Sequence, residues 1–413
     1  MSKNRIVVVT DIGSSKVTTL VADIDEVDGL HIIGWGESPS NGIEKGVITN
    51  PNELVKSVRE SLSLAENSSG FRITTTVVNI SGQHIDFKVE IEGLSFQNQS
   101  KEIDENDIAF LIEKVSEKVP KDISSILHIL PKKYLLDDEL VLEPIGLIGS
   151  KLDVEFNIVT TKLNVFNNLK KVVESTGVEI IDFVVNPIAS AMSVLFEEEK
   201  DLGIVCVDIG ASLSDIAIYK NGNLEYLRSL PLGGNLITKD IAYRFRISKE
   251  VAESIKKQLG MSSVEFIESE ESIDIPTRED GESVRINRYE LVETIEWRLS
   301  EILEIVRKEI EKTGLYERLN AGIVITGGVA NTPYIQEFAQ KVLDKEVRIG
   351  KPKGYKGFSD KFSYPDFATG IGMLQFVKTY KLVNREFSKS RNQGNLNISE
   401  MVNRFFDKIK ELF

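Results

Sequence analysis

The stretch VVVTDIGSSKVTTLVADI, residues 7–24, resembles a second stretch, GIVCVDIGASLSDIAIYK, residues 203–220. Each contains an apolar, β-branched run, then Asp-Ile-Gly, then a second apolar run. This is the pattern of two strands joined by a tight turn. Its recurrence indicates an internal duplication, with two similar halves that face each other across a cleft. A chance recurrence of a short unit is the alternative interpretation.

Length and composition narrow the class of protein. The chain has 413 residues, and single cores stop growing at roughly 250–300 residues, so we expect two lobes or more. The net charge of −14 argues against a nucleic-acid partner, because phosphate backbones require a basic face. One cysteine and three histidines are too few for a disulfide or a zinc cluster. Cys206 lies in an apolar run and is predicted to be a core residue.

Each Asp-Ile-Gly turn has the chemistry of a phosphate site. The chain has no Walker A and no G-x-G-x-x-G motif, but glycine lets the backbone approach an anion and turn its N–H groups towards it. Lys16 adds positive charge. The carboxylates of Asp11 and Asp208 would repel phosphate, so we predict that they hold Mg²⁺ through water. The hydroxyl groups that would add donors are those of Ser14, Ser15, Ser212 and Ser214.

One such turn is more typical of a plain hairpin, but a third element favours a nucleotide. Gly327 and Gly328 follow another apolar run, and they leave room for a flat adenine or ribose. Glu253 and Lys256 lie one helical turn apart. By themselves they indicate only a surface salt bridge, which contributes little to stability.

Two insertions interrupt the duplicated pattern. Residues 85–161 contain short strands and a charged helix at 105–118, which indicates a small α+β domain. The second insertion contains an acidic loop at 265–282 and an amphipathic helix at 289–312. The acidic loop is interpreted as solvated surface, because its carboxylates lack the spacing of a calcium loop. Between the insertions, Asn186 is predicted to cap a helix over 188–198.

Together these motifs resemble the actin/Hsp70/sugar-kinase superfold, and longer stretches are similar to the FtsA family of bacterial cell-division proteins. The stretches that carry the similarity are SGQHI (81–85), HILPKKYLLDD (128–138), EPIGLIGSKLDVEFNIVT (143–160), PLGGNLITKDIA (231–242) and VITGGVANTPYI (324–335). The resemblance implies an α/β, actin-like two-lobe fold, with duplicated ribonuclease-H-like domains around a nucleotide cleft and with the inserted subdomain 1C. The expected parts are subdomain 1A at 1–84 and 162–202, 1C at 85–161, 2A at 203–231 and 314–387, and 2B at 232–313.

The resemblance also implies ATP with Mg²⁺ in the cleft. It places Gly233, Gly234, Asn235 and Thr238 near the nucleotide, and Glu253 and Lys256 near the ribose or base. The full set of expected nucleotide-binding residues is Asp11, Gly13, Ser14, Ser15, Lys16, Asp208, Gly210, Ala211, Ser212, Ser214, Gly233, Gly234, Asn235, Glu253, Lys256, Gly327, Gly328 and Val329, with Asp11 and Asp208 as the metal residues.

Two departures from the family pattern bear on activity. The second turn reads Gly-Ala-Ser-Leu-Ser-Asp over 210–215, where many relatives have Gly-Gly-Gly-Thr-Thr-Asp, so its side chains would reshape the phosphate contacts. Hydrolysing relatives such as MreB carry an acidic residue where this chain has Asn186. General-base chemistry needs a group close to the attacking water, and no histidine lies in either turn. We expect ATP binding with slow or absent turnover.

The partners implied by the resemblance are other copies of the chain in an actin-like filament formed partly through 1C, the C-terminal peptide of the tubulin-like protein FtsZ on 2B, and other divisome proteins. The implied location is the cytoplasmic side of the bacterial membrane at the septum. Two alternatives remain: a pilus-assembly scaffold similar to PilM, and a small-molecule kinase of the same superfold. A kinase would need an acidic residue whose carboxylate acts as a general base and deprotonates a substrate hydroxyl, and the sequence offers no obvious candidate.

The end of the chain is predicted to attach to a membrane. Residues 388–397 are polar and indicate a flexible linker, and 398–413 have the periodicity of an amphipathic helix. From residue 388 onward there are five Lys or Arg and three Asp or Glu, which suits a helix in a membrane interface. A helix docked on the body is the alternative. The expected membrane-facing residues are Ile398, Met401, Val402, Phe405, Phe406, Ile409, Leu412 and Phe413.

Overall fold

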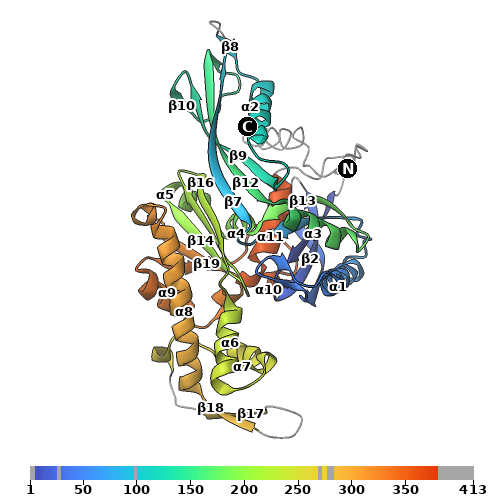
Figure 1. Ribbon diagram of the computed structural model, residues 1–413, viewed down its shortest axis with the longest axis vertical. Helices are drawn as coiled ribbons and strands as arrows, with labels where there is room; N and C mark the ends of the chain where they lie inside the picture. The colour runs from blue at the N-terminus through green and yellow to red at the C-terminus, as the bar shows by residue number, and fades with distance from the viewer. Residues whose placement is uncertain (1–4, 26–28, 97–99, 268–271, 277–282, 380–413) are drawn as a thin grey trace.

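The computed structural model describes residues 5–25, 29–96, 100–267, 272–276 and 283–379. The linker and helix predicted at 388–413 lie outside these residues. Figure 1 shows two sheets side by side at the centre of the molecule, with a small domain beyond one end and a helical domain beyond the other. Among the described helices, none combines the length and the apolar character needed to cross a membrane.

The first sheet has the strand order β13-β6-β1-β2-β3. The β-branched runs form antiparallel β1 and β2, whose paired residues end at Ile12 and Val17, and β6 lies parallel to β1. Helix α1 begins at Pro51, capped by the side chain of Asn50, and packs on β2 and β3. The elements of this lobe are β1 (Arg5–Ile12), β2 (Lys16–Asp25), β3 (Gly29–Pro39), α1 (Pro51–Ser69), β6 (Thr75–Ile80), α3 (Leu163–Glu174), β13 (Glu179–Val185), α4 (Asn186–Val194) and α5 (Glu197–Leu202).

The second sheet repeats this arrangement, with the order β16-β15-β14-β19-β20. Its central hairpin has the same register, ending at Ile209 and Ser214. The predicted duplication and the actin-like fold class are therefore confirmed. The elements are β14 (Ile204–Ile209), β15 (Ser214–Lys220), β16 (Asn223–Leu230), β19 (Ile323–Thr326), α9 (Ile335–Leu343) and β20 (Val347–Ile349).

Helices α4 and α11 (Ala368–Thr379) lie against each other between the two sheets. A Cβ added at Gly372 would lie 1.7 Å from the Ala189 carbonyl oxygen, so only glycine allows this approach. The core around them joins both sheets and includes Cys206, which is buried as predicted. Helix α11 packs on β1 and α4, whereas the predicted segment 314–387 assigns it to the second lobe.

Three predicted helix boundaries differ from the structure. The helix predicted over 188–198 is divided, because the chain is extended at Leu195 and Phe196. Residue Val185 occupies the N-cap position of α4, and Asn186 is its first helical residue. Thr332 and Pro333 in the sequence predict a capped helix that begins at Pro333, but α9 starts at Ile335, with Tyr334 in the left-handed region at the N-cap.

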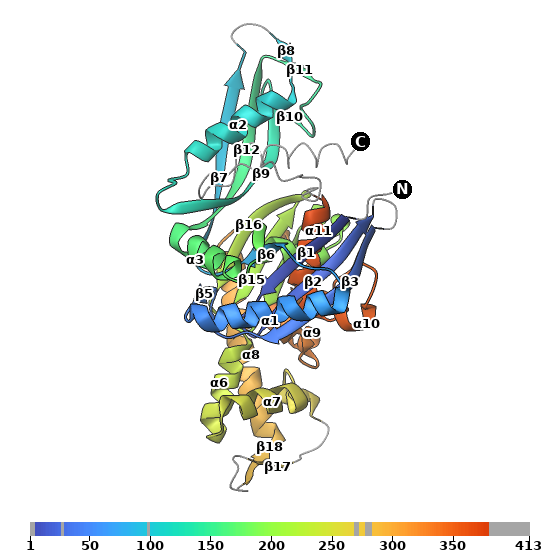
Figure 2. The same cartoon turned by 90° about the vertical axis from the view of Figure 1, so that its right-hand side faces the viewer.

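The inserted domain has its own sheet, with the order β10-β9-β12-β7, and its own core under α2. Figure 2 shows it standing beyond the central sheets. Helix α2 is capped reciprocally by Asp104 and Asp107. The elements are β7 (Ile85–Ser95), β8 (Lys101–Glu102), α2 (Glu105–Glu117), β9 (Ser124–Leu136), β10 (Glu139–Val141), β11 (Ile148–Gly149) and β12 (Lys151–Lys162).

The helical domain at the opposite end packs α6 on α7 and α8. The segment predicted as an acidic loop, 265–282, contains the strand β17, which pairs antiparallel with β18 directly after it. The elements are α6 (Gly234–Phe245), α7 (Lys249–Leu259), β17 (Ser272–Pro276), β18 (Ser283–Asn287) and α8 (Arg288–Glu311). The short helix α10 (Ser359–Phe362) precedes α11.

The inserted domain is covalently rooted in the first lobe but also rests on the second. The ammonium of Lys132 on β9 lies 2.8 Å from a Glu155 oxygen and 2.7 Å from a Glu225 oxygen on β16, and its side chain is only 6% exposed. The Asn157 amide donates to the Leu224 carbonyl at 2.6 Å. The contacts with Glu225 and Leu224 fix the inserted domain against the second lobe.

We predict that Lys132→Ala lowers the free energy of unfolding by about 3 kcal/mol, because it leaves two shielded carboxylates without their shared cation. Lys133→Ala is the matched control, since that ammonium is more exposed and lies 3.6 Å from Glu155. It should cost less than about 1 kcal/mol. Urea unfolding followed by circular dichroism measures both, and equal losses would contradict the assignment.

Candidate functional site

The two Asp-Ile-Gly turns have the same internal geometry. The N–H of Gly13 donates to the Lys16 carbonyl at 3.0 Å, and the N–H of Gly210 donates to the Leu213 carbonyl at 2.9 Å. Both turns line one cavity of about 580 Å³ between the lobes. The hydroxyl oxygens of Ser14 and Ser212 lie 2.5 Å apart. The structure thus brings the two turns face to face, as the duplication predicts.

Most of the residues predicted to contact a nucleotide line this cavity. They are Asp11, Gly13, Ser14, Ser15, Lys16, Asp208, Gly210, Ala211, Ser212, Gly234, Asn235, Glu253, Lys256, Gly327, Gly328 and Val329. Ser214 and Gly233 do not line it. The buried hydroxyl of Ser214 donates to the Leu232 carbonyl at 3.0 Å. Gly233 lies behind the second turn, where a Cβ would be 2.6 Å from the Gly210 oxygen.

The N-terminus of α6 is fastened to the second turn. The N–H groups of Gly234 and Asn235 donate to the carbonyls of Gly210 and Ala211 at 2.9 and 2.7 Å. These two donors are therefore used to position the turn, and they are not free for a ligand. The turn itself keeps its Ser212 side chain towards the first lobe.

Asp11 and Asp208 lie at the ends of β1 and β14. Asp11 accepts a hydrogen bond from the Asn79 amide at 2.7 Å, and Asp208 accepts from Ser190 and, at 3.1 Å, from Thr369. Burial and the Asp208 carboxylate raise the pKa of Asp11 to about 7, although Lys16 opposes the shift. Burial also raises the pKa of Asp208.

Two buried carboxylates of this kind suit a divalent cation that keeps most of its water shell. Among the described residues, no cluster of three or more Asp, Glu, His or Cys side chains is arranged to hold a metal. A cation here would therefore need further oxygen ligands from water or phosphate.

Sequence reasoning missed two polar residues beside these carboxylates. Asp215 accepts from Ser81 and Ser229, each at 2.5 Å, and burial together with Asp208 raises its pKa to about 7. Asn79, the residue before the last of β6, accepts a hydrogen bond from the Ile12 N–H at 2.6 Å. The register between adjacent strands was the available signal, because Asp215 pairs with Asp208 across the second hairpin.

Lys16 and Asn186 both line the cavity, but neither has the predicted surroundings. The Lys16 ammonium lies 2.7 Å from Asp366 and 3.1 Å from Glu37, so its charge is neutralised within the protein. Asn186 does not cap α4. Its side-chain oxygen accepts from the Asn79 amide at 3.1 Å, which directs it towards the first turn.

Glu253 and Lys256 form an ion pair of 2.6 Å at the cavity wall, not on open surface. The Lys256 ammonium also donates to Thr238 at 2.9 Å and to the Gly234 carbonyl at 3.2 Å. Burial lowers the pKa of Lys256. Burial opposes ionisation of Glu253, but hydrogen bonds from Lys256 and Thr238 lower its pKa overall.

The glycines after β19 differ in their surroundings. Gly327 has φ +84°, and a Cβ there would lie 2.2 Å from an Asp208 oxygen, so a side chain is excluded. A Cβ at Gly328 would meet only the Asp366 Cβ, at 4.0 Å. Gly328 therefore presents bare backbone to the cavity without being required by the fold.

Comparison with known proteins places this geometry in context. The sequence model of the family described as cell division protein FtsA matches residues 205–372, and that of the SHS2 domain inserted in FtsA matches residues 82–160. The cell division protein FtsA of Neisseria meningitidis serogroup B is 36% identical over 379 residues, which cover 90% of this chain and 90% of that protein.

Two solved structures share the fold at low sequence identity. A PilM–PilN type IV pilus biogenesis complex aligns with a TM-score of 0.63 and 15% identity, covering 92% of this chain and 99% of the matched one. MreB5 of Spiroplasma citri, a structure described as bound to ADP, aligns with a TM-score of 0.58 and 16% identity, covering 91% of this chain and 97% of the matched one.

We predict that the free energy of unfolding falls as the pH rises from about 4 to about 7 in the absence of ligand. The raised pKa values of Asp11 and Asp215 mean that the folded state keeps protons that the unfolded state has already lost. Asp11→Asn and Asp215→Asn should each flatten this slope, whereas the exposed Asp86→Asn should not. Urea unfolding at several pH values tests this, and identical slopes for all variants would contradict it.

Proposed function

The chain belongs to the FtsA family of cell division proteins, and on that premise we propose that it binds ATP with Mg²⁺, polymerises as an actin-like filament and tethers FtsZ to the membrane at the septum. The observation that carries this proposal is the pair of duplicated turns that face each other across one cavity. The location that follows is the cytoplasmic side of the bacterial membrane, with the chain bound peripherally.

The cavity supports a nucleotide in a defined orientation. We assign the phosphates to the two turns, because backbone N–H groups and serine hydroxyls suit an anion. Asp11 and Asp208 would hold Mg²⁺ through water, and the charge of the metal would favour the ionised forms of both carboxylates. The base and ribose would lie between Gly328 and the Glu253–Lys256 pair. The MreB5 structure bound to ADP shows the same fold, which supports this assignment by analogy alone.

We propose that hydrolysis is slow or absent. Asn186 occupies the place of the acidic residue of hydrolysing relatives, and its amide oxygen already accepts from Asn79. An amide is a poor general base, because its oxygen binds a proton only weakly. Asp215 is buried and accepts hydrogen bonds from two serine hydroxyls. We therefore propose that its carboxylate positions these side chains and does not activate an attacking water.

The helical domain offers a surface for the FtsZ C-terminal peptide. Tyr243 on α6 and Trp297 on α8 are 88% and 65% exposed. The Arg244 guanidinium lies 5.7 Å from the centre of a Trp297 ring and pairs with Glu293 at 2.8 Å. Aromatic and arginine side chains dominate binding hot spots. We therefore propose that the peptide docks on α6 and α8.

Filament formation and membrane binding would reinforce each other. Leu140, Leu142 and Ile148 are exposed at the far end of the inserted domain, and such apolar patches are typical of protein contacts. One amphipathic tail over 398–413 would bind a membrane reversibly, whereas a filament carrying many tails would bind by avidity. Other divisome proteins remain proposed partners.

The pilus-assembly alternative rests on fold alone, because the PilM–PilN likeness has 15% identity. Relatives at 31–36% identity are cell division proteins. The kinase alternative is not favoured by the family matches, which are to cell division proteins. The FtsZ peptide therefore provides the deciding test.

We predict that Gly328→Val raises the Kd for ATP at least about tenfold, because its side chain would fill the place of the base. Gly328→Ala should have a smaller effect. Isothermal titration calorimetry with Mg²⁺ measures both. Thermal unfolding without nucleotide is the control and should change little, because Gly328 faces open space. Unchanged affinity in the valine variant would place the base elsewhere.

We predict that liposome sedimentation separates the two tethering functions. The full chain should carry a fluorescent FtsZ C-terminal peptide into the pellet, whereas a chain ending at Phe387 should bind the peptide but stay in the supernatant. Trp297→Ala should pellet without the peptide, with affinity reduced at least about tenfold. Phe110→Ala, an exposed aromatic of the inserted domain, is the matched control. Sedimentation of the shortened chain would contradict the role of the tail.

A further inference from the structure

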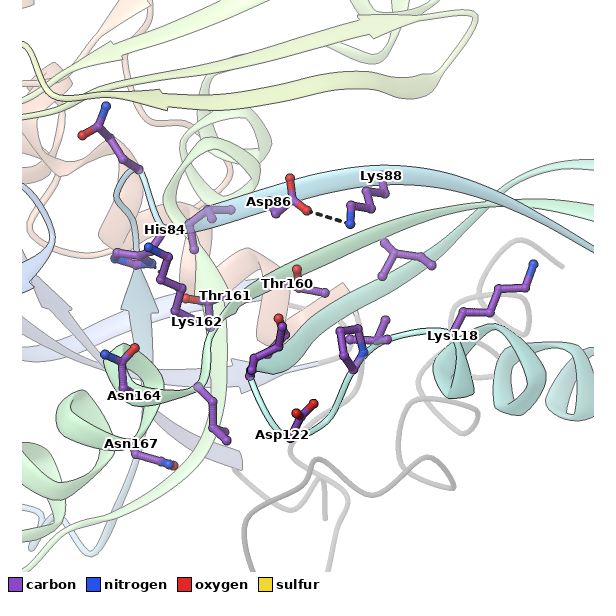
Figure 3. A pocket seen from close by; sticks show the side chains of 18 of the residues that line it. His84, Asp86, Lys88, Lys118, Asp122, Thr160, Thr161, Lys162, Asn164 and Asn167 are labelled. Carbon is purple, nitrogen blue, oxygen red and sulfur yellow. Dashed lines mark hydrogen bonds and ion pairs between the residues drawn. The ribbon is translucent and has the colours of Figure 1, made fainter.

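A second cavity, of about 820 Å³, lies where the inserted domain joins the first lobe. Figure 3 shows His84 and Thr161 next to each other on its wall, with Lys162 and Asn164 at the start of α3 beside them. His84 precedes β7, on which the insertion leaves the first lobe, and Thr161 lies near the end of β12, on which it returns. This pair of residues therefore holds the two connections of the inserted domain together.

We call the two connections at His84 and Thr161 the root of the inserted domain. A small hairpin lies between this root and the nucleotide cavity. It consists of β4 (Ile43–Glu44) and β5 (Val47–Ile48), joined by Lys45 and Gly46. Both turn residues have positive φ, +51° and +75°, which is the geometry of a two-residue type I′ turn. Gly46 also lines the nucleotide cavity. The hairpin is thus a wall of the cleft that ends directly above the root of the insertion.

On the cleft side, the hairpin is tied to the second lobe. The N–H of Lys45 donates to the Ser212 hydroxyl oxygen at 3.0 Å. The same oxygen lies 2.5 Å from the Ser14 hydroxyl. Ser212 is therefore the point at which both turns and the hairpin meet. A glycine at this position would lack the hydroxyl and both contacts.

On the other side, the hairpin is tied to His84. The Nε2 atom of His84 lies 3.1 Å from the Gly46 carbonyl oxygen, and its Nδ1 atom lies 2.8 Å from the Thr161 hydroxyl oxygen. Burial lowers the pKa of His84, which favours the neutral ring. Since a carbonyl only accepts, Nε2 carries the proton and Nδ1 accepts from Thr161. Both ring nitrogens are then satisfied.

The packing around these bonds leaves little freedom. A Cβ at Gly46 would lie 1.9 Å from the Ser81 carbonyl oxygen, and one at Gly82 would lie 2.6 Å from His84 Nε2. The hairpin is therefore seated directly on the turn that leads into the insertion. A displacement of Gly46 therefore reaches His84 through the contacts that Gly46 makes with Ser81 and with the His84 ring.

We propose that His84 is a positioning residue that couples phosphate in the cleft to the root of the inserted domain, through Ser212 and the hairpin. This inference rests on the proposed nucleotide binding. A phosphoryl group held by both turns takes hydrogen bonds that Ser14 and Ser212 now make with each other. Ser212 then shifts relative to Lys45, and the shift passes through Gly46 to His84 and Thr161. The inserted domain thereby responds to the nucleotide without contacting it.

Hydrogen–deuterium exchange on the full chain, with and without Mg²⁺ and the ATP analogue AMPPNP, tests the coupling. In the wild type, the analogue should change amide exchange both at the two turns and at the root segments 82–90 and 156–165, by about fivefold or more. Calorimetry on the same samples measures binding. If the analogue binds and protects the turns but leaves the root unchanged, the coupling is overturned while the proposed function stands. If no analogue binds, both fail.

A matched pair of variants separates coupling from general destabilisation. Thr161→Val removes the hydroxyl with little change of shape, and it should keep the affinity for AMPPNP within about twofold while abolishing the root response. Thr160→Val, on the opposite face of β12, should keep both. Ser212→Ala is a second variant, which should raise root exchange in the nucleotide-free protein. A root response retained in Thr161→Val, or unaltered root exchange in Ser212→Ala, would overturn the proposal.

Discussion

The structure depends on the close contact of α4 and α11 between the two sheets. Gly372 lets the helices approach until the backbone of one meets the other. At their contact, Ser190 and Thr369 lie 2.9 Å apart and both donate to Asp208. One carboxylate at the end of β14 is thereby held by helices of the opposite lobe. The packing of the core and the position of the site are consequences of the same contact.

This arrangement explains the electrostatics of the cleft. Asp11, Asp208 and Asp215 are brought together by strand ends that meet at one edge, and burial raises the pKa of each. Neutral hydroxyl and amide groups surround them, and Lys16 is already paired with Asp366 and Glu37. We propose that a cleft of this kind binds a hydrated cation, which a triphosphate with Mg²⁺ would supply together with its own oxygen ligands.

The inserted domain is attached covalently to the first lobe and packs against the second. Its two connections pass through Ser81 to His84 and through Thr161, next to the hairpin of β4 and β5. Its sheet nevertheless meets the second lobe through Lys132 and Glu225. Because the inserted domain is attached to both lobes, its position depends on how the two lobes are placed relative to each other. In the filament that we propose, the exposed Leu140 and Leu142 of this domain would lie where they can contact another copy of the chain.

The sequence by itself determined the duplication, the strand hairpins, the two insertions and most cavity residues, because strand periodicity and Asp-Ile-Gly turns are local properties. It also predicted the amphipathic tail, outside the described residues. Only the tertiary structure decided which hydrogen-bonding groups near the cavity already have a partner within the protein. It showed Ser214 bonded to Leu232, Gly233 behind the turn, Asn186 bonded to Asn79, and α11 packed in the first lobe. These features depend on contacts between distant segments, and a hydrogen bond to one partner excludes the others that sequence alone leaves open.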